Sequence, residues 1–369
     1  MHRLGLIVCL ALAAPLAEPV PRKPTSAALK LTTPLTHVSA AHELRDGRVV
    51  LTNAKSPSVL VLDPRTGATT PLGSAGAGPD QYARPGGLYA GPNGSTLLLD
   101  RGLTRLMTIS TTGTLHGTRS IAQRGTSSSS DADVDLQRVD ARGFAYFANR
   151  HALGESVAGQ PQYAALVRFD PEAQKQESIA QLRQPDRKTF AGGDGMVFSR
   201  SVVGSPEDGW GVASDGRIAI VRADPYRVEW LAPDGKVTSG PVITHDPLPM
   251  TDADRQAFKA STRGPGVLVG SAGDKGSPLG ALPIEFAAMK PPFKAEDVIV
   301  SPDARVWVLR TRPLDAREVI YDLFDGTGRR VDRFELPAGS RIVGFGPSSI
   351  YVRHIDEPDR CELRKYLVR

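Results

Sequence analysis

The sequence is poor in cysteine, which limits what can hold the fold together. It has 2 cysteines among 369 residues, and Cys9 lies in an apolar N-terminal stretch that is typical of a cleaved signal. The remaining Cys361 can form neither an internal disulfide nor a thiolate zinc site on its own. Stability must therefore come from a hydrophobic core. Hydrophobic residues make up 40% of the chain, which excludes disorder over its whole length.

Long apolar runs and a strong charge of one sign are also missing. No run of 18 apolar residues follows the N-terminal stretch, which excludes a polytopic membrane protein and predicts no integral span in the mature chain. Glycine shows no period of three, which excludes collagen. The net charge of +5 is mild for this length. It allows a local basic patch but does not indicate nucleic acid, and we expect no nucleic-acid partner.

Common catalytic motifs are absent as well. The chain contains neither His-Glu-x-x-His nor Gly-x-Ser-x-Gly. Alternating acids occur at Asp131–Asp135, but Leu136 stands where a calcium-binding loop needs glycine. The sequence therefore predicts no catalytic residue, and whether the protein is an enzyme is left open.

The N-terminus has the layout of a secretory signal. Arg3 is followed by an apolar stretch, Leu4–Ala14, that is too short to span a membrane. We expect a signal peptide at residues 1–17, a linker at 18–28, and a periplasmic or secreted mature chain. Two alternatives are a retained membrane anchor and a lipoprotein attached at Cys9.

Turn residues are abundant, with 37 glycines and 30 prolines, and they recur in a pattern. Six times a turn residue is followed by a β-prone apolar run that ends in a polar residue six positions later. These units begin at Gly47, Gly94, Gly143, Gly216, Ala304 and Pro347. In most units a second β-prone run and a second turn follow.

Six such meanders of four short strands predict a six-bladed β-propeller, an all-β fold, over residues 29–369. The last unit ends before its outer strand. We expect the β-prone segments 29–33 and 35–38 to supply it and so to close the ring. The long insertion 244–296 contains Thr251, a candidate helix N-cap, and serves either as a lid or as a surface loop.

One segment carries a resemblance to a known family. Gly73–Leu88 combines a glycine-rich stretch, Tyr82 and Pro85 ahead of a strand, and resembles the start of a blade in NHL-repeat propellers. Asp224–Trp230 resembles a turn in secreted bacterial six-bladed propellers of unassigned function. The resemblance implies a six-bladed, extracytoplasmic propeller and no single activity.

The polar residues that end the apolar runs are candidates for a site. They are Asn53, Asp100, Asn149, Arg222, Arg310 and Arg353, followed closely by Arg101, Arg150, Arg312 and His354. Equivalent positions converge around a propeller axis. The arginines and His354 are therefore expected to form a funnel for an anionic ligand, because a planar guanidinium binds an oxyanion through two hydrogen bonds.

Two other interpretations remain open. Asn53, Asp100 and Asn149 offer hard oxygen ligands for Ca²⁺, as in gluconolactonase-like propellers. Alternatively, all of these residues cap strand ends and pair across blades. The sequence therefore predicts an exported, non-catalytic binding or scaffolding propeller without a cofactor, whose partner is an anionic small molecule, a glycan or a protein. The alternative function is a Ca²⁺-dependent lactonase, another hydrolase or a lyase.

Overall fold

The computed structural model describes residues 19–29, 37–121, 138–149, 160–191, 197–261, 283–357 and 360–368. The predicted signal peptide and the Asp131–Asp135 motif lie outside these residues. The described chain is all-β apart from the helix α1 (Asp252–Ser261) and a short 3₁₀ turn at Pro92–Gly94. Within these ranges no helix combines the length and the apolar character needed to cross a membrane.

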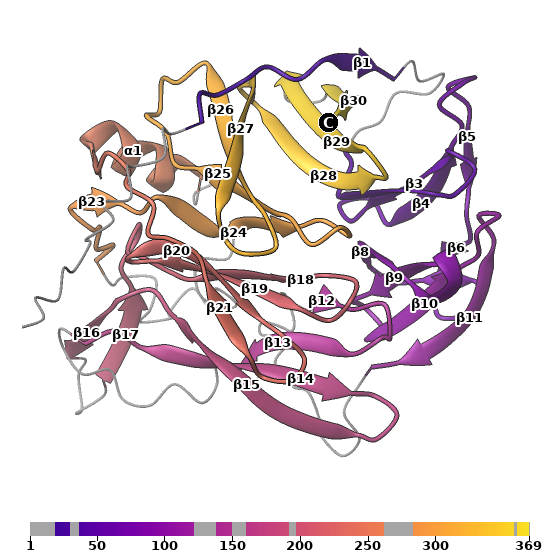
Figure 1. Cartoon of the computed structure of the whole chain (residues 1–369), viewed down its shortest axis with the longest axis horizontal. Helices are drawn as coiled ribbons and strands as arrows, with labels where there is room; N and C mark the ends of the chain where they lie inside the picture. The colour runs from indigo at the N-terminus through magenta and orange to yellow at the C-terminus, as the bar shows by residue number, and fades with distance from the viewer. Residues whose placement is uncertain are drawn as a thin grey trace, which may run out of the picture.

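Four sheets are four-stranded antiparallel meanders, and each forms one blade of a propeller-like fold. The sheets follow one another around a common centre (Figure 1). Their strands are β8 (Pro85–Ala90), β9 (Thr96–Asp100), β10 (Arg105–Ile109) and β11 (Leu115–Ser120); β12 (Arg138–Val139), β13 (Ala145–Asn149), β14 (Tyr163–Asp170) and β15 (Lys175–Arg183); β18 (Gly209–Val212), β19 (Ile218–Ala223), β20 (Tyr226–Leu231) and β21 (Val237–Ser239); and β24 (Phe293–Val300), β25 (Val306–Arg310), β26 (Glu318–Phe324) and β27 (Arg330–Pro337).

The remaining large sheet has eight strands and joins the two ends of the chain. Its order is β1 (Ser26–Ala28), β30 (Arg360–Leu367), β29 (Ser349–Glu357), β28 (Ser340–Gly346), β2 (Ala40–Glu43), β3 (Val49–Asn53), β4 (Ser58–Leu62) and β5 (Thr69–Pro71). All neighbours are antiparallel except β2 and β28, which pair in parallel at Ala41–Gly344 and His42–Phe345.

The structure therefore gives four separate blades and one double-width sheet, where the repeat predicted six separate blades. The physical reason is the close approach of β2 to β28. A side chain on Gly344 would collide with the Ala41 carbonyl, so glycine is what allows the two strands to hydrogen-bond. An N-terminal strand does pair with β30, but it is β1, inside the predicted linker. Most of the predicted segments 29–33 and 35–38 lies outside the described residues.

The insertions form small sheets beside the blades. They are β6 (Ser74–Ala75) with β7 (Gln81–Tyr82), β16 (Arg187–Ala191) with β17 (Val197–Ser201), and β22 (Leu248–Pro249) with β23 (Met289–Lys290). The predicted N-cap is confirmed: the Asp254 N–H donates to Thr251 Oγ1, and the Thr251 N–H donates back to the Asp254 carboxylate. A bridge between Val203 and Phe286 ties the two longer insertions together.

The core lies between neighbouring sheets and comes from the apolar runs that defined the repeat. Leu98 and Met107 pack against Val50 and Val59 of the adjacent sheet, all with essentially no exposed surface. The three tryptophans are buried, and the free Cys361 is only 7% exposed. These side chains are therefore packing residues of the core.

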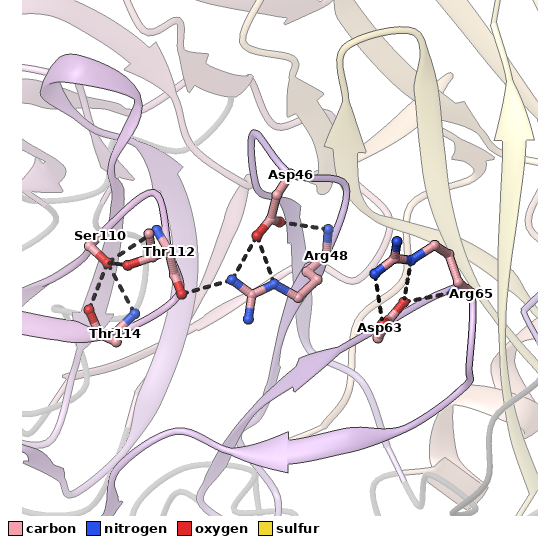
Figure 2. Close-up of polar contacts among 7 residues, drawn as sticks. All are labelled: Asp46, Arg48, Asp63, Arg65, Ser110, Thr112 and Thr114. Atoms are coloured by element: carbon pink, nitrogen blue, oxygen red, sulfur yellow. Dashed lines mark hydrogen bonds and ion pairs between the residues drawn. The ribbon is translucent and has the colours of Figure 1, made fainter.

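Arginines in the first turn of several sheets fasten that sheet to the next one. Asp46 accepts the Arg48 N–H at 3.0 Å and the Arg48 Nε at 2.8 Å, and Arg48 Nη2 donates to the Thr112 carbonyl of the following sheet at 2.8 Å (Figure 2). Ser110 holds that receiving turn through Thr112 and Thr114. Asp-x-Arg turns recur at Asp140–Arg142 and Asp215–Arg217.

Glu43 connects the two halves of the eight-stranded sheet. Its carboxylate, on β2, accepts from the Tyr351 hydroxyl at 2.7 Å on β29 and pairs with Lys365 Nζ at 2.9 Å on β30. Burial and this carboxylate raise the pKa of Tyr351 well above its usual value. The Glu43 side chain is only 12% exposed, so these bonds are shielded from water and contribute more than surface pairs do.

We expect Glu43→Ala to lower the free energy of unfolding by about 2–4 kcal/mol, because it leaves a buried hydroxyl and a shielded ammonium without their acceptor. The matched control is Glu172→Ala, which removes an ion pair whose carboxylate is 80% exposed, and it should cost less than about 1 kcal/mol. Urea unfolding measures both. Equal losses in the two variants would contradict a joining role for Glu43.

Candidate functional site

The inner strands surround a cavity of about 490 Å³ at the centre of the molecule. Its wall comes from the first strand of each four-stranded sheet and from the two strands that meet in parallel in the eight-stranded sheet. The contributing strands are β2, β8, β12, β18, β24 and β28. We call this space the axial cavity. Gly86 and Gly211 lie at its wall and let neighbouring side chains pack closely, because a Cβ would press on Arg101 at Gly86 and collide with Val300 at Gly211.

Irregular pairing shapes the wall of the axial cavity. The register of β8 against β9 shifts between Pro85 and Leu88, and that of β24 against β25 shifts between Phe293 and Val298. Such bulges turn side chains away from the regular alternation. Gly86 lies in the first shift, and Arg101 packs directly on it: a Cβ at Gly86 would lie 3.1 Å from Arg101 Nε.

The charged side chains at the axial cavity are mostly cationic. Arg84, Arg101 and Arg138 border it, and Glu296 is the carboxylate among the lining residues. Arg84 is exposed and has no ion-pair partner among the described residues, while the Arg138 guanidinium lies over the Trp210 ring at 5.6 Å. His42 also lines the cavity, and burial lowers its pKa to about 4, so it is neutral near pH 7.

Three of the predicted funnel arginines are paired with carboxylates. Arg222 contacts Asp208 and Glu229, both at 2.7 Å. Arg310 pairs with the fully buried Asp322 at 3.1 Å.

Arg312 pairs with Glu318 at 2.5 Å. The positive charge of these three arginines is therefore largely compensated within the protein, which reduces what they offer to an anion.

The other predicted funnel residues lie in different settings. Arg101 borders the axial cavity, and Arg150 lies outside the described residues. His354 is 8% exposed, and its Nδ1 lies 3.2 Å from the Ser340 hydroxyl. Arg353 contacts the His37 ring and the Val38 carbonyl. The structure thus places only Arg101 of this set at the axial cavity.

The three predicted calcium ligands do not present a common set of free oxygens. Asp100 has no exposed surface, and its carboxylate accepts from the N–H groups of Ala83, Arg84 and Gly102 and from Arg105. Asn53 Oδ1 accepts two backbone N–H groups of its own turn.

Asn149 ends β13. No group of three or more His, Cys, Asp or Glu that could hold a metal ion occurs in the described part of the chain. Because the Asp100 oxygens are already used, these residues do not fit Ca²⁺, and Asp100 and Asn53 cap turns instead.

Sequence reasoning missed Arg138 and Glu296 and did not single out Arg84. Their common signal is a polar residue in or just before the first, innermost strand of a unit, whereas the predicted site residues follow the second strand. Glu296 and its neighbour Asp297 interrupt an otherwise apolar strand at its bulge. Burial raises the pKa of Asp297 to about 6, although Arg341 lies 3.8 Å away.

Comparisons with known proteins give similarity of architecture only. No protein-family model matches the sequence, and no curated protein matches it. Among solved structures, the chain is similar to virginiamycin B lyase from Staphylococcus aureus, with 12% identity, a TM-score of 0.43, and coverage of 94% of this chain and 99% of the other.

A member of the DUF4221 family from Bacteroides vulgatus shows 8% identity, a TM-score of 0.44, and coverage of 95% and 97%. The calcium-binding protein regucalcin from Agrobacterium tumefaciens shows 12% identity, a TM-score of 0.40, and coverage of 95% of each chain. At these identities and scores the similarities carry no information about activity.

Asp100→Ala should lower the free energy of unfolding by about 3 kcal/mol or more, because it leaves buried N–H groups and Arg105 without an acceptor. Asp46→Ala is the matched control, since Asp46 also binds a backbone N–H and an arginine but is 43% exposed. Its cost should stay below about 1 kcal/mol. Chemical unfolding measures the free energy of unfolding of both variants. A much larger loss for Asp100→Ala than for Asp46→Ala would identify Asp100 as a buried cap, whereas equal losses would contradict that role.

The pH dependence of stability should reveal two groups with opposite effects. The lowered pKa of His42 means that the unfolded chain binds more protons between about pH 4 and 6.5, so its contribution to stability is lost as pH falls through that window. The raised pKa of Asp297 acts in the other direction, and its contribution is lost as pH rises from about 3.8 to 6.

Melting temperatures measured from pH 4 to 7 should therefore respond oppositely to two substitutions. His42→Gln should make stability fall more steeply with rising pH, and Asp297→Asn should make it rise more steeply. Slopes that change in the same sense would contradict the assignment.

Proposed function

We propose that this protein is an exported, non-catalytic binding propeller that holds a small anionic molecule in the axial cavity. The observation that carries the proposal is the composition of the cavity wall: three arginines, one carboxylate and a neutral histidine. A volume of about 490 Å³ lies in the range usual for small-molecule sites. Export is supported by the basic and apolar N-terminal residues.

We infer that the ring has six blades and that β1 closes it. The eight-stranded sheet divides naturally at its parallel pair into β2–β5 and β28–β30 with β1. Each half is then a four-stranded antiparallel meander whose inner strand borders the axial cavity, like the other four. With this division, β1 is the outer strand of the last blade and covers the edge of β30, so that one blade contains both N-terminal and C-terminal strands.

The chemistry of the cavity wall favours a carboxylate, phosphate or sulfate group on the ligand. Arg101 is fixed against Gly86 and Arg138 over Trp210, so both guanidinium groups are partly ordered before a ligand arrives. Arg84 lies at the same side of the cavity and is exposed. Arginines held in this way bind oxyanions through paired, charge-assisted hydrogen bonds.

The test is isothermal titration of the mature protein with a panel of small phosphates, sulfates and mono- and dicarboxylates, with neutral polyols for comparison. Arg84→Ala/Arg101→Ala should weaken binding of the responding anion at least about tenfold. The control is Arg65→Ala, whose side chain is 86% exposed and remote from the cavity wall. A ligand that binds equally well to the double variant, or turnover of a lactone lost on Asp100→Asn, would overturn the proposal.

A further inference from the structure

Arg353 stands apart from the other arginines that end second strands, because its charge is not compensated. Its Nη1 donates to the Val38 carbonyl at 3.1 Å and lies 3.0 Å from His37 Nε2. No carboxylate of the described residues lies within ion-pair distance of it. Arg222 and Arg310, at the equivalent strand ends, each have a buried or nearly buried carboxylate partner.

One edge of the Arg353 guanidinium has no hydrogen bond. Its Nε is buried and has no partner, and neither neighbouring strand supplies an acceptor to Nη2 among the described residues. The Nε–Nη2 edge is the one through which a guanidinium binds both oxygens of an oxyanion. A buried, charged donor without an acceptor lowers the stability of the fold. An oxyanion bound at this edge would therefore stabilise it.

The neighbours of Arg353 add positive charge. Lys55, in the turn after β3, is exposed. Burial, the charge of Arg353 and the charge of Lys55 together lower the pKa of His37. Burial and the charge of Arg341 on β28 lower the pKa of Arg353 itself.

The Cys361 thiol on β30 and the Tyr321 hydroxyl on β26 also act on Arg353 and raise its pKa, and the pKa of Cys361 is itself raised by burial. Three strands and one turn therefore bring cationic or neutral groups to this point.

We propose that Arg353, His37 and Lys55 form a binding site for a small oxyanion of the phosphate, sulfate or carboxylate class. The Nε–Nη2 edge of Arg353 holds two oxygens, the His37 ring donates a further hydrogen bond, and the Lys55 ammonium reaches the anion from the exposed turn. None of these three residues borders the axial cavity. The site has different residues from the one proposed above and does not depend on it, although Ser39 and Ala54, close in the chain to His37 and Lys55, line the axial cavity.

The probe is sulfate, which remains a dianion throughout the titration range of histidine. The His37 ring protons are followed by NMR against pH, with the resonance assigned by its loss in His37→Gln. Because an anion favours the charged imidazolium, sulfate should raise the pKa of His37 from its lowered value and raise the melting temperature. Chloride at equal ionic strength should do neither.

Two variants test the site. Arg353→Gln should weaken sulfate binding at least about tenfold, and Lys55→Ala about threefold. Lys55 is exposed and its replacement leaves the core unchanged, so this variant keeps the test decisive if Arg353→Gln does not fold. Lys23→Ala, 80% exposed and distant in the fold, is the control and should bind as the parent does.

The Arg84→Ala/Arg101→Ala protein separates this site from the axial cavity. It should keep the full His37 response to sulfate while losing binding in the cavity. No response of His37 to sulfate, or a response unchanged by Lys55→Ala and Arg353→Gln, would overturn the proposal. A response lost in the Arg84→Ala/Arg101→Ala protein would overturn it too, because the anion would then be bound in the axial cavity.

Discussion

Pairing between arginines and buried carboxylates is the interaction on which the charge distribution of this protein depends. Asp100, Asp208 and Asp322 are almost completely shielded from water, and each holds arginine as well as other donors at the end of a second strand. A shielded carboxylate without such partners would be too costly to keep ionised. The pairs therefore fix strand ends and, at the same time, reduce what the paired arginines offer to anions in solution.

The capacity of the protein to bind an anion therefore depends on which arginines pair with carboxylates and not on the number of arginines. The basic side chains at the centre are Arg84, Arg101 and Arg138, which line the axial cavity in or beside the first two strands of their sheets. Arg353 is the exception among the strand-end arginines because its sheet places His37 and a carbonyl where the others have a carboxylate. A chain of mild net charge can in this way concentrate positive potential at two small places.

The repeat in the sequence predicted the all-β blades, and Thr251 predicted the insertion helix, because these features follow from local turn and cap chemistry and from alternation. Gly47 and Gly216, for example, adopt positive φ in the turns that marked the units. The double-width sheet was not predictable, since β2 and β28 lie at opposite ends of the chain. The partners of Arg222 and Arg310 were also not predictable: Asp208 lies just before β18 and Asp322 lies on β26, and the sheet registers bring them into contact with the arginines.

The Asp-x-Arg turns mean that the blades are not independent modules. Arg48 belongs to the eight-stranded sheet but bonds a carbonyl of the adjacent blade, and Arg142 lies against Gly216 of the blade that follows its own. If a blade were duplicated or deleted, these arginines would contact a turn of different sequence. Such a rearrangement would therefore need compensating changes in the adjacent blade. Exchange of whole repeats in the evolution of this chain would therefore have to preserve or rebuild the contacts of these turns.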